Sequence, residues 1–128
     1  MHLCSGRRAI FCTWRQVAAP FGANVGGCNP LLVSASPDAA FDSWLTVGIT
    51  DGDSAGWLSS IGIDWTAWTI AAGLTAANGA VFWMSPGDGP ADRAVIAQVT
   101  VPAGAVCFRH SHSRVYKHRC TILVYTHV

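Results

Sequence analysis

The chain has no glutamate and a single lysine among its 128 residues, and all seven of its acidic residues are aspartates. Exposed helices are commonly stabilised by Glu–Lys pairs one turn apart, whereas Asp is typical of turns and loops. No apolar run reaches the roughly 20 residues that a membrane-spanning helix needs. These absences favour a β-rich protein with Asp-bearing loops, and they predict no membrane span.

The common catalytic motifs are also missing. The sequence contains no Gly-x-Ser-x-Gly nucleophile elbow and no glycine-rich phosphate loop. An Asp-based enzyme would need a concave pocket that holds two carboxylates from the set Asp42, Asp51, Asp53, Asp64, Asp88 and Asp92. A pair such as Asp51 and Asp53 in one glycine-rich turn is more typical of a solvated loop. We therefore predict that the protein is not an enzyme and has no catalytic residues.

Charge and cysteine placement divide the chain into three parts. The aspartates all lie between residues 38 and 92, and the basic residues lie before and after this stretch. The predicted parts are an irregular basic N-terminal segment (1–19), a β-module (20–106) and a basic His/Cys-containing tail with an edge strand (107–128). An odd number of cysteines leaves at least one thiol unpaired, and they are Cys4, Cys12, Cys28, Cys107 and Cys120. No apolar segment typical of a secretory signal follows the early arginines.

The tail carries metal-donor residues at alternate positions, His110 with His112 and His118 with Cys120. Such donors suit a transition metal, but the spacing matches no structural zinc signature and the flanking basic residues would repel a cation. An incidental basic tail is the alternative that we favour. Because basic charge is confined to the two ends and no binding motif accompanies it, no nucleic-acid partner is predicted.

Four apolar, mostly alternating segments bounded by turn-forming residues predict strands at 41–49, 58–65, 80–84 and 95–101. In the first segment the odd positions, from Phe41 to Ile49, are expected to face the core. The third is a continuous apolar run, and both of its faces are expected to be buried. Weaker strand candidates are 31–33 and 121–125, and at most one short helix is expected, near residues 66–72, with an irregular crossover as the alternative.

Short strands separated by frequent turn signals are typical of an antiparallel β-sandwich, so the fold class is predicted to be all-β. A sandwich has about seven strands, and the sequence shows fewer, so the predicted sandwich is incomplete. We expect a fragment of a larger protein, with an exposed sheet edge. The predicted core residues are Phe41, Leu45, Val47, Ile61, Ile63, Phe82, Met84, Val95, Val99 and Val101.

The order of several segments between residues 20 and 104 resembles a repeat module found in large secreted proteins of marine bacteria and microalgae. The matching segments include FDSWLTVG (41–48), LSSIGID (58–64), GAVFWMSP (79–86) and AQVTVP (97–102). These modules are uncharacterised extracellular β-sandwich domains, so the resemblance implies an extracellular or cell-surface location. It also implies neighbouring modules or cell-surface polymers as partners, and it names no activity.

A candidate calcium site begins at Asp51-Gly52-Asp53, because hard cations take several oxygen ligands from a short, glycine-bearing loop. Asp88, in a Gly/Pro-rich loop, would add a ligand if the two loops converged. The segment departs from the full EF-hand pattern, with Ala55 at a donor position and Gly62 where a bidentate Glu would stand. A plain solvated turn is therefore the alternative that we favour, and no other cofactor is predicted.

The chain has six tryptophans, which is many for its length. An exposed indole on a β-sandwich can stack on a sugar ring while loop carboxylates bind the hydroxyl groups. Trp44 is the best candidate, since it is the large apolar residue on the otherwise polar face of its strand, and Trp57 is the second. The alternative is that Trp44 is covered by a neighbouring segment and that the others belong to the core.

Together these patterns predict a non-catalytic, extracellular structural or adhesion module that is part of a larger repeat protein. The competing hypothesis is a carbohydrate-binding module that uses exposed Trp and loop Asp residues, with glycans as partners.

Overall fold

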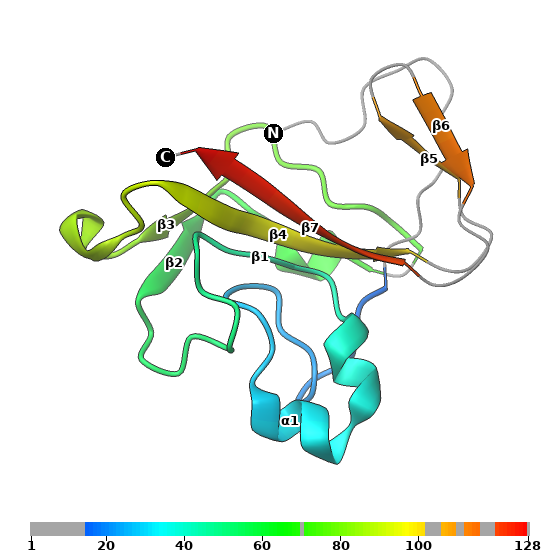
Figure 1. Cartoon of the computed structure of the whole chain (residues 1–128), viewed down its shortest axis with the longest axis horizontal. Coiled ribbons are helices and arrows are strands. Elements are labelled where there is room, and N and C mark those ends of the chain that lie inside the picture. The colour runs from blue at the N-terminus through cyan, green and yellow to red at the C-terminus, as the bar shows by residue number, and fades with distance from the viewer. Residues whose placement is uncertain (1–14, 70, 102–105, 110–111, 116–119, 128) are drawn as a thin grey trace.

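The computed structural model describes residues 15–69, 71–101, 106–109, 112–115 and 120–127 (Figure 1). Within this part of the chain the regular structure is mostly strand. The strands are β1 (Trp44–Leu45), β2 (Leu58–Ile61), β3 (Ala80–Trp83), β4 (Arg93–Val101), β5 (Val106–Arg109), β6 (His112–Val115) and β7 (Cys120–His127). One short α-helix, α1 (Pro30–Ala35), is accompanied by the 3-10 turns η1 (Pro37–Phe41), η2 (Trp65–Ala67) and η3 (Pro86–Asp88).

The long strand β4 is the centre of a three-stranded antiparallel sheet with the order β1-β4-β7. Figure 1 shows β4 and β7 side by side along most of their length. Their register runs from Arg93 opposite His127 to Val101 opposite Cys120, with a shift between Val95 and Ala97. The predicted strands at 95–101 and 121–125 are thus confirmed, each slightly longer than expected, and β7 lies at an edge of the sheet.

Two further antiparallel pairs, β2 with β3 and β5 with β6, complete the strands. In the β2–β3 pair Leu58 lies opposite Trp83 and Ile61 opposite Ala80. The predicted strand at 58–65 is too long, because β2 ends before Gly62, which has a φ of +67°. A Cβ at this glycine would overlap the carbonyl oxygen of Asn78, so the chain turns away where only glycine fits.

The α-helix lies where the sequence indicated a strand, at 31–33, and that prediction is wrong. Asn29 is the N-cap, and its Oδ1 accepts a hydrogen bond of 2.9 Å from the backbone N–H of Leu31. Pro30 follows at the first helical position, where its missing N–H costs nothing. The helix expected near 66–72 is only the turn η2, which Asp64 caps through the N–H of Thr66.

The first predicted strand, 41–49, is reduced to Trp44–Leu45, and its predicted inward face is wrong. Phe41 closes the turn η1 and is 37% exposed, whereas Asp42, Trp44 and Thr46 are buried. The even positions therefore point inward, with Ser43 buried as well. The physical reason is hydrogen bonding, since polar side chains can be buried when every group finds a partner.

The buried carboxylate of Asp42 joins three segments of the chain. It accepts hydrogen bonds from the backbone N–H groups of Val17 (2.8 Å), Ala23 (2.7 Å) and Ser43 (2.9 Å). The backbone carbonyl of Asp42 accepts a further bond of 2.8 Å from the side chain of Gln98 on β4. A single polar residue thus fixes the segment before α1, the approach to β1 and the centre of the sheet.

Ser43 extends this arrangement to the start of the described chain. Its N–H donates to the carbonyl of Arg15 (3.0 Å), and its hydroxyl accepts from the N–H of Thr100 (3.1 Å). The N–H of Arg15 in turn donates to the carbonyl of Thr100 at 2.8 Å. We call Asp42, Ser43, Gln98 and Thr100 the polar centre. Residues 15–17 are part of the packed structure, although they precede the predicted module boundary at residue 20.

Among the residues whose side chains are described, the apolar core is small. Trp68 and Val101 are buried together, and partly buried side chains pack against them: Leu45, Trp65, Leu74 and Val99. Val101 confirms its predicted core position, but Phe41, Ile61, Phe82 and Met84 are exposed, and their prediction as core residues is wrong. The two faces of β3 are not both buried, because residues alternate between exposed and half-buried along it. None of the helices in the described residues is long and apolar enough to cross a membrane.

Candidate ligand-binding hollow

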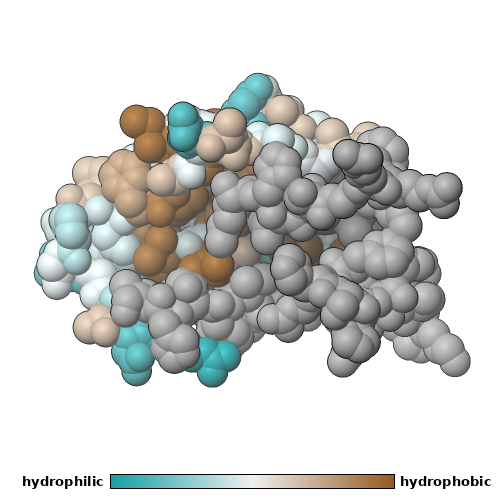
Figure 2. Space-filling model, turned by 90° about the horizontal axis from the view of Figure 1, so that it is seen from above, coloured by the Kyte–Doolittle hydropathy of each residue, from teal (hydrophilic) through white to brown (hydrophobic). Residues whose placement is uncertain are grey.

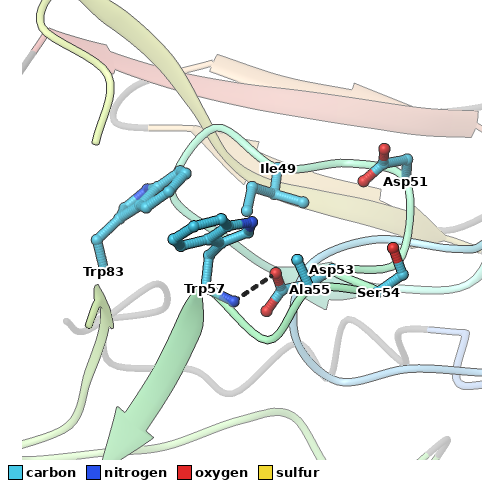
Figure 3. Close-up of a pocket in the computed structure, with 7 residues that line it drawn as sticks. All are labelled: Ile49, Asp51, Asp53, Ser54, Ala55, Trp57 and Trp83. Carbon is cyan, nitrogen blue, oxygen red and sulfur yellow. Dashed lines mark hydrogen bonds between the residues drawn. The ribbon is translucent and has the colours of Figure 1, made fainter. Parts of the chain in front are cut away.

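A surface hollow of about 280 Å³ lies between the loop at residues 49–57 and the end of β3 (Figure 3). Its volume is near the lower end of ligand pockets, which start at about 300 Å³. Figure 3 shows the indole of Trp83 on one side and the carboxylate groups of Asp51 and Asp53 on the other, with Trp57 between them. The lining residues are Ile49, Asp51, Asp53, Ser54, Ala55, Trp57 and Trp83.

The two indoles form a tilted pair, with ring centroids 6.1 Å apart and an angle of 33° between the planes. Trp83 is held in place because its Nε1–H donates to the carbonyl oxygen of Val47 at 2.6 Å. Trp57 directly precedes β2, and its carbonyl accepts from the N–H of Met84 at 2.9 Å. The Trp57 side chain is nevertheless 45% exposed. The hollow therefore combines one fixed, half-buried indole with one indole that is open to solvent.

Asp53 organises the acidic side of the hollow. One carboxylate oxygen accepts from the N–H of Trp57 and the other from the N–H of Leu58, each at 2.9 Å. Its φ is +47°, a left-handed conformation that Asp tolerates better than most residues. The loop packs closely on the preceding segment, since a Cβ added to Gly26 would lie 2.6 Å from Cβ of Asp53. Asp53 thus fixes both the turn and the start of β2.

Asp51 has a different role in the same loop. Its backbone is held by a bridge to Gly27, and the side chain is exposed. Within the described part of the chain its carboxylate takes part in no hydrogen bond or ion pair. Asp51 is therefore the acidic group of the hollow that is available to a ligand, while Asp53 supports the loop.

The three predicted calcium ligands do not come together. Asp88 ends the exposed turn η3 and does not line the hollow that holds Asp51 and Asp53. No group of three His, Cys, Asp or Glu side chains that could hold a metal is present among the described residues. Both carboxylate oxygens of Asp53 already accept backbone hydrogen bonds, which corresponds to the plain-turn alternative for this residue.

Trp44, the preferred candidate for sugar stacking, is only 3% exposed, so its predicted exposure is wrong. It lies opposite Gln98 in the sheet and faces inward with Asp42 and Thr46. Its Nε1–H finds no acceptor among the residues that the structure describes. The alternative, in which Trp44 is covered, is the one observed. Trp57 is exposed as proposed, and it lies beside Asp51 and Asp53.

Sequence reasoning missed Trp83 as a member of the site, because the apolar run at 80–84 indicated a strand buried on both faces. The pairing of Leu58 with Trp83 brings this indole to the acidic loop, and no local pattern encodes that long-range register. The GAVFWMSP segment marks only the strand and the turn that follows it. Pairing between distant strands is therefore the information that the sequence alone does not supply.

The other aspartates that were considered for catalysis do not share the hollow. Burial raises the pKa of Asp42, although three backbone hydrogen bonds and the charge of Arg15 act in the opposite direction. The hydroxyl and the N–H of Thr66 lower the pKa of the exposed Asp64. The hollow does bring Asp51 and Asp53 together, but both oxygens of Asp53 accept backbone hydrogen bonds. Of this pair, Asp51 is therefore the one whose carboxylate takes part in no hydrogen bond among the described residues.

The cysteine and tail predictions fall mostly outside the described residues. Cys28 is a free thiol, and burial, followed by the negative charge of Asp42, raises its pKa. The donors at 110 and 118 lie outside the described residues, and the side chains of the residues at 112 and 120 are not described. The predicted metal alternative for the tail stays a prediction.

The described part of the chain is thus β-rich, with a polar centre and a small aromatic and acidic hollow. No known protein family, no curated protein and no solved structure matches it.

Proposed function

We propose that this chain is a non-catalytic binding module that holds a sugar ring in the hollow between Trp57, Trp83 and Asp51. The observation that carries the proposal is the tilted indole pair, 6.1 Å between centroids, in one hollow with an available carboxylate. The apolar face of a sugar ring stacks on indole, and its hydroxyl groups donate to a carboxylate. The surrounding fold is proposed to be an incomplete antiparallel β-sandwich in an extracellular or cell-surface protein.

The geometry fits a single ring better than an extended chain. A hollow of about 280 Å³ is small for a ligand pocket. The indole of Trp83 is fixed, since its Nε1–H is bonded to Val47, and it packs against the exposed indole of Trp57, on which the sugar ring is proposed to stack. The carboxylate of Asp51, which lies across the hollow from Trp83 in Figure 3, is proposed to accept hydrogen bonds from the sugar hydroxyl groups. The proposed ligand is therefore a terminal sugar or a short segment of a surface glycan.

A second candidate function, a structural or adhesion module that contacts a neighbouring module or a cell-surface polymer, is favoured by a different observation. The side chains of Ile61, Phe82 and Met84 are 65%, 41% and 64% exposed. Figure 2 shows apolar side chains on the surface of the molecule from above. Exposed apolar groups of this kind favour contact with another surface. The two functions are compatible, since an adhesion module can bind a glycan with one region and a neighbour with another.

The test is binding of the full chain to an array of neutral and charged glycans, followed by titration calorimetry on the ligands that bind. Trp57→Ala removes the exposed indole and is expected to weaken binding about tenfold or more, as for an anchor residue of a small site. Phe82→Ala is the matched control, because it removes an exposed aromatic side chain from the same strand pair but not from the hollow. Its affinity is expected to equal that of the wild type.

Two results would contradict the proposal. If the wild type binds no glycan, the hollow is not a sugar site. If Phe82→Ala weakens binding as much as Trp57→Ala does, the sugar lies on the exposed face of β3 rather than in the hollow.

A further inference from the structure

The charged side chains that line the hollow in the described part of the chain are both negative. Among the described residues, its lining includes two carboxylates, Asp51 and Asp53, and no Lys, Arg or His. Within the described chain, the guanidinium of Arg15 pairs with Asp38 at 3.0 Å and does not line the hollow. The charge of Asp51 is therefore not balanced by a basic neighbour among the lining residues.

The two indoles, like the carboxylates, attract a positively charged ligand. The face of an indole carries partial negative charge and attracts a cation placed over it. Trp83 lies on one side of the hollow and the carboxylates of Asp51 and Asp53 on the other, with Trp57 between them (Figure 3). A ligand in the hollow therefore meets aromatic groups as well as carboxylates. Both contributions favour a positively charged ligand, and both disfavour an anionic one.

We infer that the hollow selects amino sugars whose amine is free and protonated over neutral sugars, and that it rejects uronic or sulfated sugars. This inference rests on the proposed function and specifies its ligand class. The ring stacks on Trp57, and the ammonium group lies beside the carboxylate of Asp51, where it replaces a hydroxyl contact with a charge-assisted hydrogen bond. Asp53 contributes its charge while its oxygens remain bonded to the backbone.

The experiment is titration calorimetry of the full chain with short oligomers of glucosamine, N-acetylglucosamine and a uronic acid, at mildly acidic pH and low salt. The glucosamine oligomer is expected to bind about fivefold tighter than the N-acetylated one, the gain of one exposed charge pair with a cation–π contribution. The uronic acid oligomer is expected not to bind. High salt should reduce the preference, because exposed charges are screened.

Two carboxamide variants locate the source of the preference. Asp51→Asn is expected to abolish most of the preference, so that the ratio of the affinities for the glucosamine and N-acetylglucosamine oligomers falls from about fivefold toward one. Asp88→Asn is the matched control, since Asp88 is exposed and lies outside the hollow. It removes the same charge from the protein and is expected to leave the preference intact.

The outcomes separate the inference from the proposed function. Equal binding of neutral and amino sugars, tighter binding of the uronic acid, or equal losses in the Asp51 and Asp88 variants would each overturn the charge selection and leave sugar binding in place. Absence of binding to every oligomer would overturn both.

Discussion

The polar centre and the β2–β3 pair of this protein are stabilised in opposite ways. Around Asp42, polar side chains are buried, and those of Asp42, Ser43 and Gln98 bond backbone groups of distant segments. In the β2–β3 pair, apolar side chains such as Ile61 and Phe82 are exposed, and only one face is covered. Among the described residues, hydrogen bonds thus fix the polar centre, while aromatic and apolar groups of the β2–β3 pair lie on the surface.

The largest expected effects compare two tryptophans. Trp44→Ala empties a buried site beside β4 and is expected to cost about 3–5 kcal/mol of unfolding free energy. Trp57→Ala removes an exposed indole and is expected to cost about 1 kcal/mol or less. Urea unfolding monitored by circular dichroism measures both. Similar losses of unfolding free energy in the two variants would contradict the distinction between the buried indole of Trp44 and the exposed indole of Trp57.

Asp42→Ala tests the hydrogen bonds of the polar centre. It leaves the N–H groups of Val17 and Ala23 without their acceptor, and each unsatisfied buried group costs about 1–3 kcal/mol. Asp42→Asn keeps one acceptor oxygen and is expected to cost clearly less. Chemical denaturation of the three proteins at one pH gives the comparison. A loss in the Ala variant no larger than in the Asn variant would show that the carboxylate does not organise this region.

The same residue predicts a pH dependence. Because burial raises the folded-state pKa of Asp42, the folded protein binds this proton more tightly than the unfolded chain does. The contribution of Asp42 to stability is therefore greatest below its unfolded pKa and declines as pH rises through the folded value. The stability difference between wild type and Asp42→Asn should fall over this range, by at most about 1.4 kcal/mol per pH unit. A difference that grows with pH would contradict the raised pKa.

The smallest effects compare two glycines with positive φ. A Cβ at Gly27, with φ of +88°, would overlap the backbone of Thr50, so Gly27→Ala is expected to cost about 2 kcal/mol or more. Gly56, with φ of +68°, has nothing within 4 Å of such a Cβ, and Gly56→Ala should cost only about 1 kcal/mol. Thermal unfolding measures which of the two variants is the less stable. The reverse order would show that a Cβ is accommodated less well at position 56 than at position 27, which would contradict the close packing of Gly27 on Thr50.

The sequence predicted the strands whose apolar alternation is unbroken. The regular Val and Ile positions of 95–101 gave β4, and the Asp/Gly segment at 51–56 was correctly expected to be a turn. The prediction failed at 41–49 because hydropathy assigns Asp42 and Thr46 to the surface, whereas hydrogen bonds from other segments bury them. A helix start was present in Asn29-Pro30, a cap followed by proline, but the short apolar run after it was interpreted as a strand.

The candidate site was predictable only in part. Trp57 and the acidic loop adjoin in sequence, so their proximity follows from a tight turn. The position of Trp83 beside this loop depends instead on strand pairing across more than twenty residues. The inward direction of Trp44 depended on the same kind of long-range contact. Local patterns therefore identified one wall of the hollow, and the tertiary structure supplied the other.

The most direct test of the account is an NMR titration of the full chain with a glycan that binds on the array, observed at the indole N–H resonances and assigned with single Trp→Phe variants. The account predicts that the Trp57 and Trp83 indole signals shift with ligand concentration, while the signal of the buried Trp44 stays in place. A shift at Trp44 with no change at Trp57 and Trp83 would contradict the hollow as the binding site.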